Sequence, residues 1–136
     1  MLKKLLLLTC LLSLFIAAPA GAATAPRMVA KSFFQSIIHR DSNQYCLLAQ
    51  NNSYPSRMEC QVDIEEWFFR SGASYAIARK QSLATLAAIP YSRVVVKRNY
   101  ARVSFPGNKI DPLYLVNNKQ GVWRFASTNN IPVFVG

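Results

Sequence analysis

A change of pattern near Pro90 constrains the fold of this 136-residue chain more than any other feature. Before Pro90, apolar residues recur every three or four positions, a spacing that favours helices. After it, β-branched and aromatic residues alternate with polar ones, which favours strands. Helical segments followed by an antiparallel sheet predict an α+β domain in which N-terminal helices pack on a curved C-terminal sheet.

The helical part divides at polar breaks. Residues 25–40 carry one wide apolar stripe, and Asp41 or Ser42 can cap a shorter helix that runs to residue 49. A third helix is expected over residues 60–70, with its acidic residues near its start and Ile64, Trp67 and Phe68 on its buried face. Residues 71–89 are ambiguous, although their alanines and leucines favour a helix.

The part after Pro90 contains two hairpin patterns. The first has its turn at residues 97–100, and the second turns at residues 117–121. Gly107 and Asn108 mark the turn between the hairpins, and a last strand is expected at residues 131–135.

The first 25 residues are typical of a cleaved secretory signal peptide. Two lysines precede a continuous apolar run and a tail of small residues, with cleavage expected after Ala22, Ala23 or Ala25. The run is short for a membrane span, which needs about 20 residues. Lipid attachment at Cys10 is an alternative, although Thr9 suits it poorly. We therefore expect a periplasmic or secreted bacterial protein with one α+β domain over residues 26–136.

Two cysteines remain after cleavage. An even pair in an oxidising compartment predicts a disulfide between Cys46 and Cys60. The spacing is wider than the C-x-x-C of redox sites, and without nearby histidines the pair is a poor zinc site. We predict a structural disulfide, no metal and no cofactor.

The charge of the chain limits its partners. Removing Lys3 and Lys4 from 16 Lys+Arg leaves 14 cations against 6 acids, which is a formal charge near +8. Such a surface attracts an anionic envelope component such as phospholipid or lipopolysaccharide, or an acidic protein. Nucleic acid is not expected, because an exported protein seldom meets it. Membrane contact is expected only through the signal peptide or through this surface attraction.

The densest cationic stretch falls on the first hairpin. We predict a basic ridge for a ligand or partner, formed by Arg93, Lys97, Arg98 and Arg102. The alternative is a solvated sheet face whose charges are spread apart.

The order of elements resembles the NTF2-like superfamily, also called cystatin-like. The resemblance rests on VAKSFFQSIIHRDSNQYCLLA at the start and on YARVSF and PLYLVNNKQGVWRFAS at the end. It implies a cone-shaped scaffold with an apolar cavity that members use as an enzyme pocket, a ligand site or a dimer surface. The last of these uses makes a homodimer one of the alternatives for this chain. The candidate cavity residues are Phe34, Ile38, Tyr45, Trp67, Tyr114 and Trp123.

Catalysis is not expected. His39, Arg40 and Asp41 form a polar break, but consecutive residues at a helix corner point in different directions, and Asp41 suits a cap. An isomerase of this superfamily needs a carboxylate inside an apolar cavity, and no acid stands alone in an apolar strand.

The sequence therefore predicts an exported, non-enzymatic binding protein that holds an apolar small molecule or an anionic ligand at the bacterial envelope. One alternative is an accessory or inhibitor-like protein that binds a partner protein through the sheet. An isomerase-like enzyme is the third reading.

Overall fold

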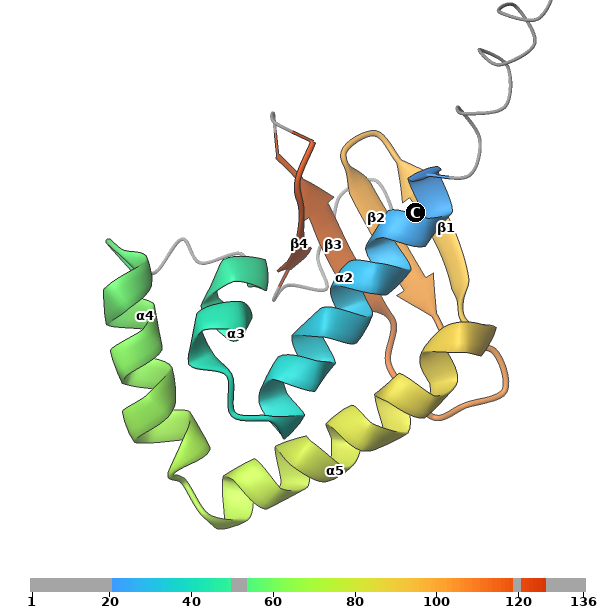
Figure 1. Cartoon of the computed structure of the whole chain (residues 1–136). Helices are drawn as coiled ribbons and strands as arrows, with labels where there is room; N and C mark the ends of the chain where they lie inside the picture. The colour runs from blue at the N-terminus through green and yellow to red at the C-terminus, as the bar shows by residue number, and fades with distance from the viewer. Residues whose placement is uncertain (1–20, 50–53, 119–120, 127–136) are drawn as a thin grey trace, which may run out of the picture.

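The computed structural model describes residues 21–49, 54–118 and 121–126 (Figure 1). The expected strand at 131–135 and most of the expected signal peptide lie outside the described residues. Within them, helices come first and a sheet follows, so the predicted α+β arrangement is confirmed.

Within residues 21–49 and 54–91 the structure contains four α-helices and two short segments of other helix types. In chain order these are α2 (Gly21–Ile38), α3 (Ser42–Leu48), α4 (Arg57–Asp63), the π-helix η1 (Ile64–Phe69), α5 (Ala73–Ala88) and the 3₁₀-helix η2 (Ile89–Tyr91). The ambiguous middle segment is therefore mostly the helix α5. Gly72 precedes α5 with φ of 63°, a conformation that glycine adopts without steric cost.

The sheet is an antiparallel meander. Its strands β1 (Arg93–Lys97), β2 (Tyr100–Ser104), β3 (Leu113–Asn117) and β4 (Trp123–Ala126) lie in the order β1-β2-β3-β4. Both predicted hairpins are present, as β1–β2 and β3–β4. The first turns at Arg98, which takes φ of 56°.

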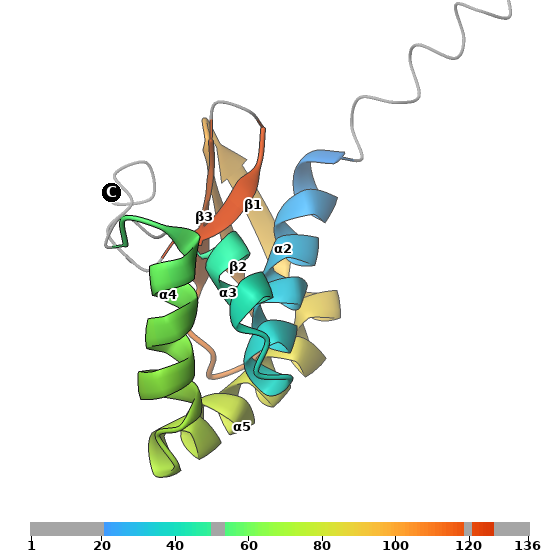
Figure 2. The ribbon, with the colours of Figure 1, turned by 60° about the vertical axis from the view of Figure 1, so that its left-hand side comes forward.

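The core forms where α2 crosses one face of the sheet (Figures 1 and 2). Ala30 is fully buried and packs with Val103 and Leu115, which are also fully buried on the facing strands. A second cluster, around Phe33 and Ile37, joins the other end of α2 to η1 and α5. The apolar stripe of α2 therefore packs against both the sheet and the other helices.

The third helix differs from its prediction in two ways. It begins at Arg57 after the cap Ser56, so Asp63, Glu65 and Glu66 lie at its end and beyond, and Glu59 is the acid in its first turn. It then continues as the π-helix η1, in which residues five apart share a face. The predicted burial of Trp67 is wrong, because this residue is 75% exposed, while Phe69 takes the inward position at 4%.

Candidate binding surface

The face of the sheet opposite α2 carries a dense set of cations. Side chains alternate between the two faces of a strand, and Ala101, Val103 and Leu115 point toward α2, so their neighbours point the other way. The pairing of the strands sorts these outward residues into rows. One row holds Lys97, Tyr100, Val116 and Arg124, the next holds Val95, Arg102, Tyr114 and Ala126, and the third pairs Arg93 with Ser104.

We call this surface the basic sheet face and define it by Arg93, Lys97, Arg102 and Arg124 with Tyr100 and Tyr114 between them. Arg102 lies opposite Val95, so Arg93 and Lys97 are its two diagonal neighbours across β1. Diagonal neighbours lie about 7–8 Å apart. The three rows contain no acidic residue. These three cations repel one another at this spacing, and an anion bound on this face would relieve the repulsion.

Burial strengthens the case for an anionic ligand. Arg93 and Lys97 are exposed, whereas Arg102 and Arg124 are half-buried. The Nε atom of Arg124 is buried and has no hydrogen-bond acceptor among residues 21–49, 54–118 and 121–126. Buried polar atoms are normally hydrogen-bonded, so this N–H is suited to donate a hydrogen bond to an anionic oxygen.

The basic sheet face contains only part of the predicted basic ridge. Three of its members share the basic sheet face, but Arg98 lies in the turn beyond the ends of β1 and β2. Sequence reasoning missed Arg124 and the two tyrosines. The alternating pattern of the second hairpin could have predicted the positions of Tyr114 and Arg124, because each lies between two residues that face α2.

The six candidate cavity residues do not gather around one hollow. Tyr114 faces away from α2, while Trp123 lies on the inner side and packs against the core. Trp67 is on the exposed side of η1, and Phe34 lines a cavity of about 340 Å³ between α5 and the loop after β2. Ile38 and Tyr45 are half-buried on α2 and α3.

Aromatic rings occupy the space between α2 and the sheet. Phe33 stacks on Phe125 with ring centroids 4.3 Å apart and an interplanar angle of 4°. The Phe34 ring meets the Phe125 ring edge-on with centroids 5.9 Å apart, and the centroid of the Tyr45 ring lies 4.9 Å from that of Phe33. Burial raises the pKa of Tyr45. These contacts make this region a packed core that holds α2, α3 and β4 together.

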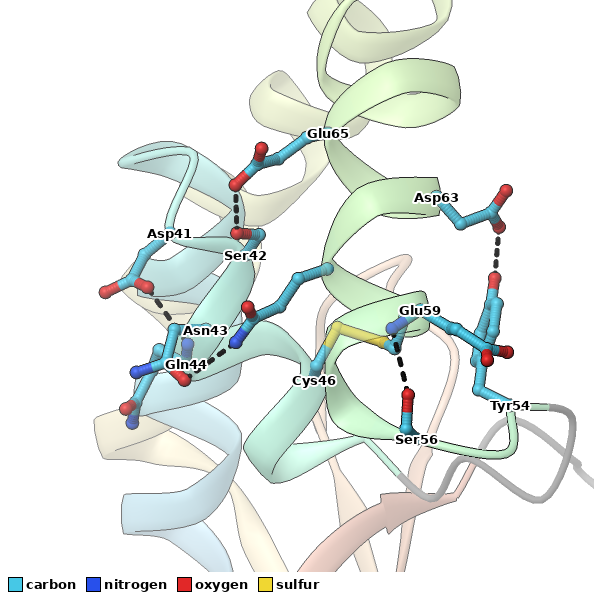
Figure 3. Close-up of a disulfide and its surroundings, with 12 residues drawn as sticks. Asp41, Ser42, Asn43, Gln44, Cys46, Tyr54, Ser56, Glu59, Asp63 and Glu65 are labelled. Atoms are coloured by element: carbon cyan, nitrogen blue, oxygen red, sulfur yellow. Dashed lines mark hydrogen bonds between the residues drawn. A yellow bond between two sulfur atoms is a disulfide. The ribbon is translucent and has the colours of Figure 1, made fainter.

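The polar break after α2 is a structural corner. Asp41 caps α3, since its side chain accepts a hydrogen bond of 2.9 Å from the backbone N–H of Gln44 (Figure 3). Arg40 takes φ of 54° and places its guanidinium 4.3 Å from the centre of the Tyr75 ring. His39 is exposed beside a polar hollow of about 220 Å³. His39 and Asp41 both line this hollow, whereas Arg40 packs on Tyr75. Because the Asp41 carboxylate is engaged as the cap of α3, the break acts as a structural corner.

The acidic residues do not form an inward site. All six lie in the described part of the chain, and none of them is buried there. Within that same part, no group of three or more His, Cys, Asp or Glu side chains could hold a metal ion, and no helix is long and apolar enough to cross a membrane.

The disulfide ties α3 to α4. Cys46 and Cys60 are joined as predicted, with their Cα atoms 6.0 Å apart. Two polar contacts flank the bond: Ser42 donates a hydrogen bond of 2.5 Å to Glu65, and the Gln61 amide donates one to Asn43 (Figure 3). The pairing fixes the α4–η1 arm, which otherwise meets the rest of the domain mainly through the second core cluster.

On the other side of α4 from the disulfide, the Tyr54 hydroxyl donates a hydrogen bond to Asp63 (Figure 3). This bond, with a smaller effect of burial, raises the pKa of Tyr54 to about 12. The tyrosine is therefore a neutral donor at physiological pH.

Comparison of the chain with protein-family models, with curated proteins and with solved structures finds no match.

Proposed function

We propose that this chain is an exported binding protein that holds an anionic component of the bacterial envelope on its basic sheet face. The observation that carries the proposal is the diagonal placement of Arg93, Lys97 and Arg102 on one face of the sheet. The ligand class is a phosphate-bearing amphiphile such as an anionic phospholipid or lipopolysaccharide. Cations near such a surface each contribute about 1 kcal/mol of attraction.

The composition of the face supports an amphiphile over a simple ion. Tyr100 and Tyr114 lie in the rows between the cations, next to Val95 and Val116. Tyrosine combines an apolar ring with a polar hydroxyl and is favoured where one side of a contact is apolar and the other is wet. The face therefore offers apolar area and positive charge together.

The aromatic core between α2 and the sheet favours this surface over an internal cavity as the binding site. The absence of a buried acid among the described residues likewise favours binding over isomerase chemistry. Export and a periplasmic or secreted location belong to the same proposal and are supported by the signal pattern and by the disulfide. The NTF2-like resemblance stays a prediction.

The second candidate is an accessory protein that binds an acidic partner through the same face. Arginine and tyrosine are enriched in protein interfaces, and the face carries both. Such a partner would be captured from an envelope extract after the lipid has been removed.

The test is sedimentation of the purified chain with vesicles of phosphatidylcholine containing phosphatidylglycerol, and with phosphatidylcholine alone. The variant Arg93→Glu/Lys97→Glu changes two exposed residues of the face. Its matched control is Arg79→Glu/Lys80→Glu, which makes the same charge change at two exposed residues of α5. We expect the face variant to bind the anionic vesicles at least about 30-fold more weakly, since about 2 kcal/mol or more is lost.

The control variant is expected to stay within about threefold of the parent chain, because its charges lie elsewhere and are screened beyond roughly 8 Å at physiological salt. Equal losses in both variants would show a response to net charge alone and would refute the proposed site. Equal binding to both kinds of vesicle would refute the anionic ligand.

A further inference from the structure

The α4–η1 arm exposes large apolar side chains beside carboxylates. Met58 is 73% exposed, Val62 50% and Trp67 75%. Together with Tyr54 and three acids they line an open cavity of about 420 Å³, which we call the α4 groove. The three acids are Glu59, Asp63 and Glu66. A side chain as large as tryptophan is rarely left this exposed without a partner.

The π-helix puts Trp67 on this side. In α4, Met58 and Val62 are four residues apart and share a face. If the α-helical spacing of four residues continued, Glu66 would follow Met58 and Val62 on this face. The wider π turn instead aligns residues five apart, so Trp67 follows Val62. Phe69 moves inward by the same change of spacing. Short π segments of this kind occur often at functional sites.

The charge of the groove is opposite to that of the rest of the chain. The formal net charge of the chain is +10, yet four of its six acids lie at positions 59, 63, 65 and 66. Glu65 accepts from Ser42 and Asp63 from Tyr54, so both have structural partners. Within the described residues, no cation pairs with the side chains of Glu59 and Glu66.

We propose that the α4 groove docks a cationic amphipathic segment of a partner protein. The apolar stripe from Met58 to Trp67 is about 13 Å long, which matches about two turns of a helix. The apolar face of such a segment would pack on Met58, Val62 and Trp67, and its lysines or arginines would reach Glu59 and Glu66. This is the helix-in-groove mode of recognition, with charge complementarity selecting the partner.

This site is separate from the cations that β1 and β2 contribute to the basic sheet face, whereas Arg124 shares a neighbouring hollow with Tyr54. α4 and the β1–β2 hairpin lie at opposite sides of the molecule in Figure 1. An anionic envelope ligand on one side and a basic protein segment on the other would let the chain link the two. The docking proposal does not depend on what the sheet binds.

The test uses a labelled helical peptide of about fourteen residues, with leucines on one face and lysines beside them. Its binding to the purified chain is followed by fluorescence anisotropy at 0.15 M salt, where the distant cations of the chain are largely screened. A matched peptide carries glutamate in place of lysine. We expect the lysine peptide to bind at least about tenfold more tightly than the glutamate peptide.

Two groups of variants locate the site. Trp67→Ala is expected to weaken binding at least about tenfold, as truncation of a central tryptophan does at interfaces. Glu59→Gln/Glu66→Gln keeps the shape of the groove and is expected to weaken binding about fivefold or more. The control Ile77→Ala/Leu83→Ala truncates exposed apolar residues of α5 and should change binding less than about twofold.

Circular dichroism checks that each variant is folded, and Met58→Ala replaces Trp67→Ala if that variant is not. Equal affinity for both peptides, or no loss in either groove variant, would overturn the proposal. A dimer in sedimentation that dissociates on Trp67→Ala would also overturn it, because the occupant would then be a second copy of the chain.

Discussion

The stacked pair Phe33–Phe125 is expected to hold α2 on the sheet, and removing it should destabilise the whole domain. Phe33 is 5% exposed and touches three other aromatic rings, including the Phe125 ring 4.3 Å away. Phe33→Ala leaves a cavity that neither helix nor strand can fill, and buried Phe→Ala changes cost about 3–5 kcal/mol. That is a large part of the stability of a small domain, which is about 5–15 kcal/mol.

The assay is urea unfolding of the parent chain and its variants at equal disulfide content, followed by circular dichroism. Phe33→Ala should lower the free energy of unfolding by about 3–5 kcal/mol with an unchanged dependence on urea. Met28→Ala, on the same helix but 60% exposed, should change it by less than about 0.5 kcal/mol. A loss below about 1 kcal/mol for Phe33→Ala would refute the packing of α2 against β4.

Three further predictions follow from local contacts. Replacing Cys46 and Cys60 by serine should lower the free energy of unfolding, measured with urea, by about 3 kcal/mol, because the bond closes a loop of 14 residues. An unchanged free energy of unfolding would contradict a stabilising role of the bond. Asp41→Ala should lower the free energy of unfolding by about 1 kcal/mol in the same assay, since α3 loses its cap. Asp41→Asn should change that free energy little, because asparagine can also cap a helix. In a spectrophotometric titration Tyr54 should ionise near pH 12, and Asp63→Asn should lower that pKa toward 10. Because the folded pKa is the higher one, the stabilisation from this bond is present below about pH 10 and is lost as the pH rises toward 12.

The sequence predicted the parts of the fold that follow from local pattern. The stripe of α2, the Asp41 cap and both hairpins depend on spacing and on turn residues close in the chain, and all are present. The disulfide pairing could be predicted by counting alone, because only two of the three cysteines lie outside the expected signal peptide.

The parts that could not be predicted depend on geometry beyond local spacing. The π-helix changes which residues share a face, so Trp67 was placed inward when Phe69 takes that position. The basic sheet face depends on the register between strands, which brings Arg124 onto the surface of Arg102 although 22 residues separate them. Neither the register nor the π turn can be derived from the composition of the segments concerned.

The measurement that tests the central claim most directly is hydrogen–deuterium exchange of the purified chain with and without phosphatidylglycerol-containing vesicles. We predict slower exchange in β1, β2 and β4 and unchanged exchange in the exposed turns of α5. Slower exchange confined to α5, or no change in any strand, would contradict binding through the basic sheet face.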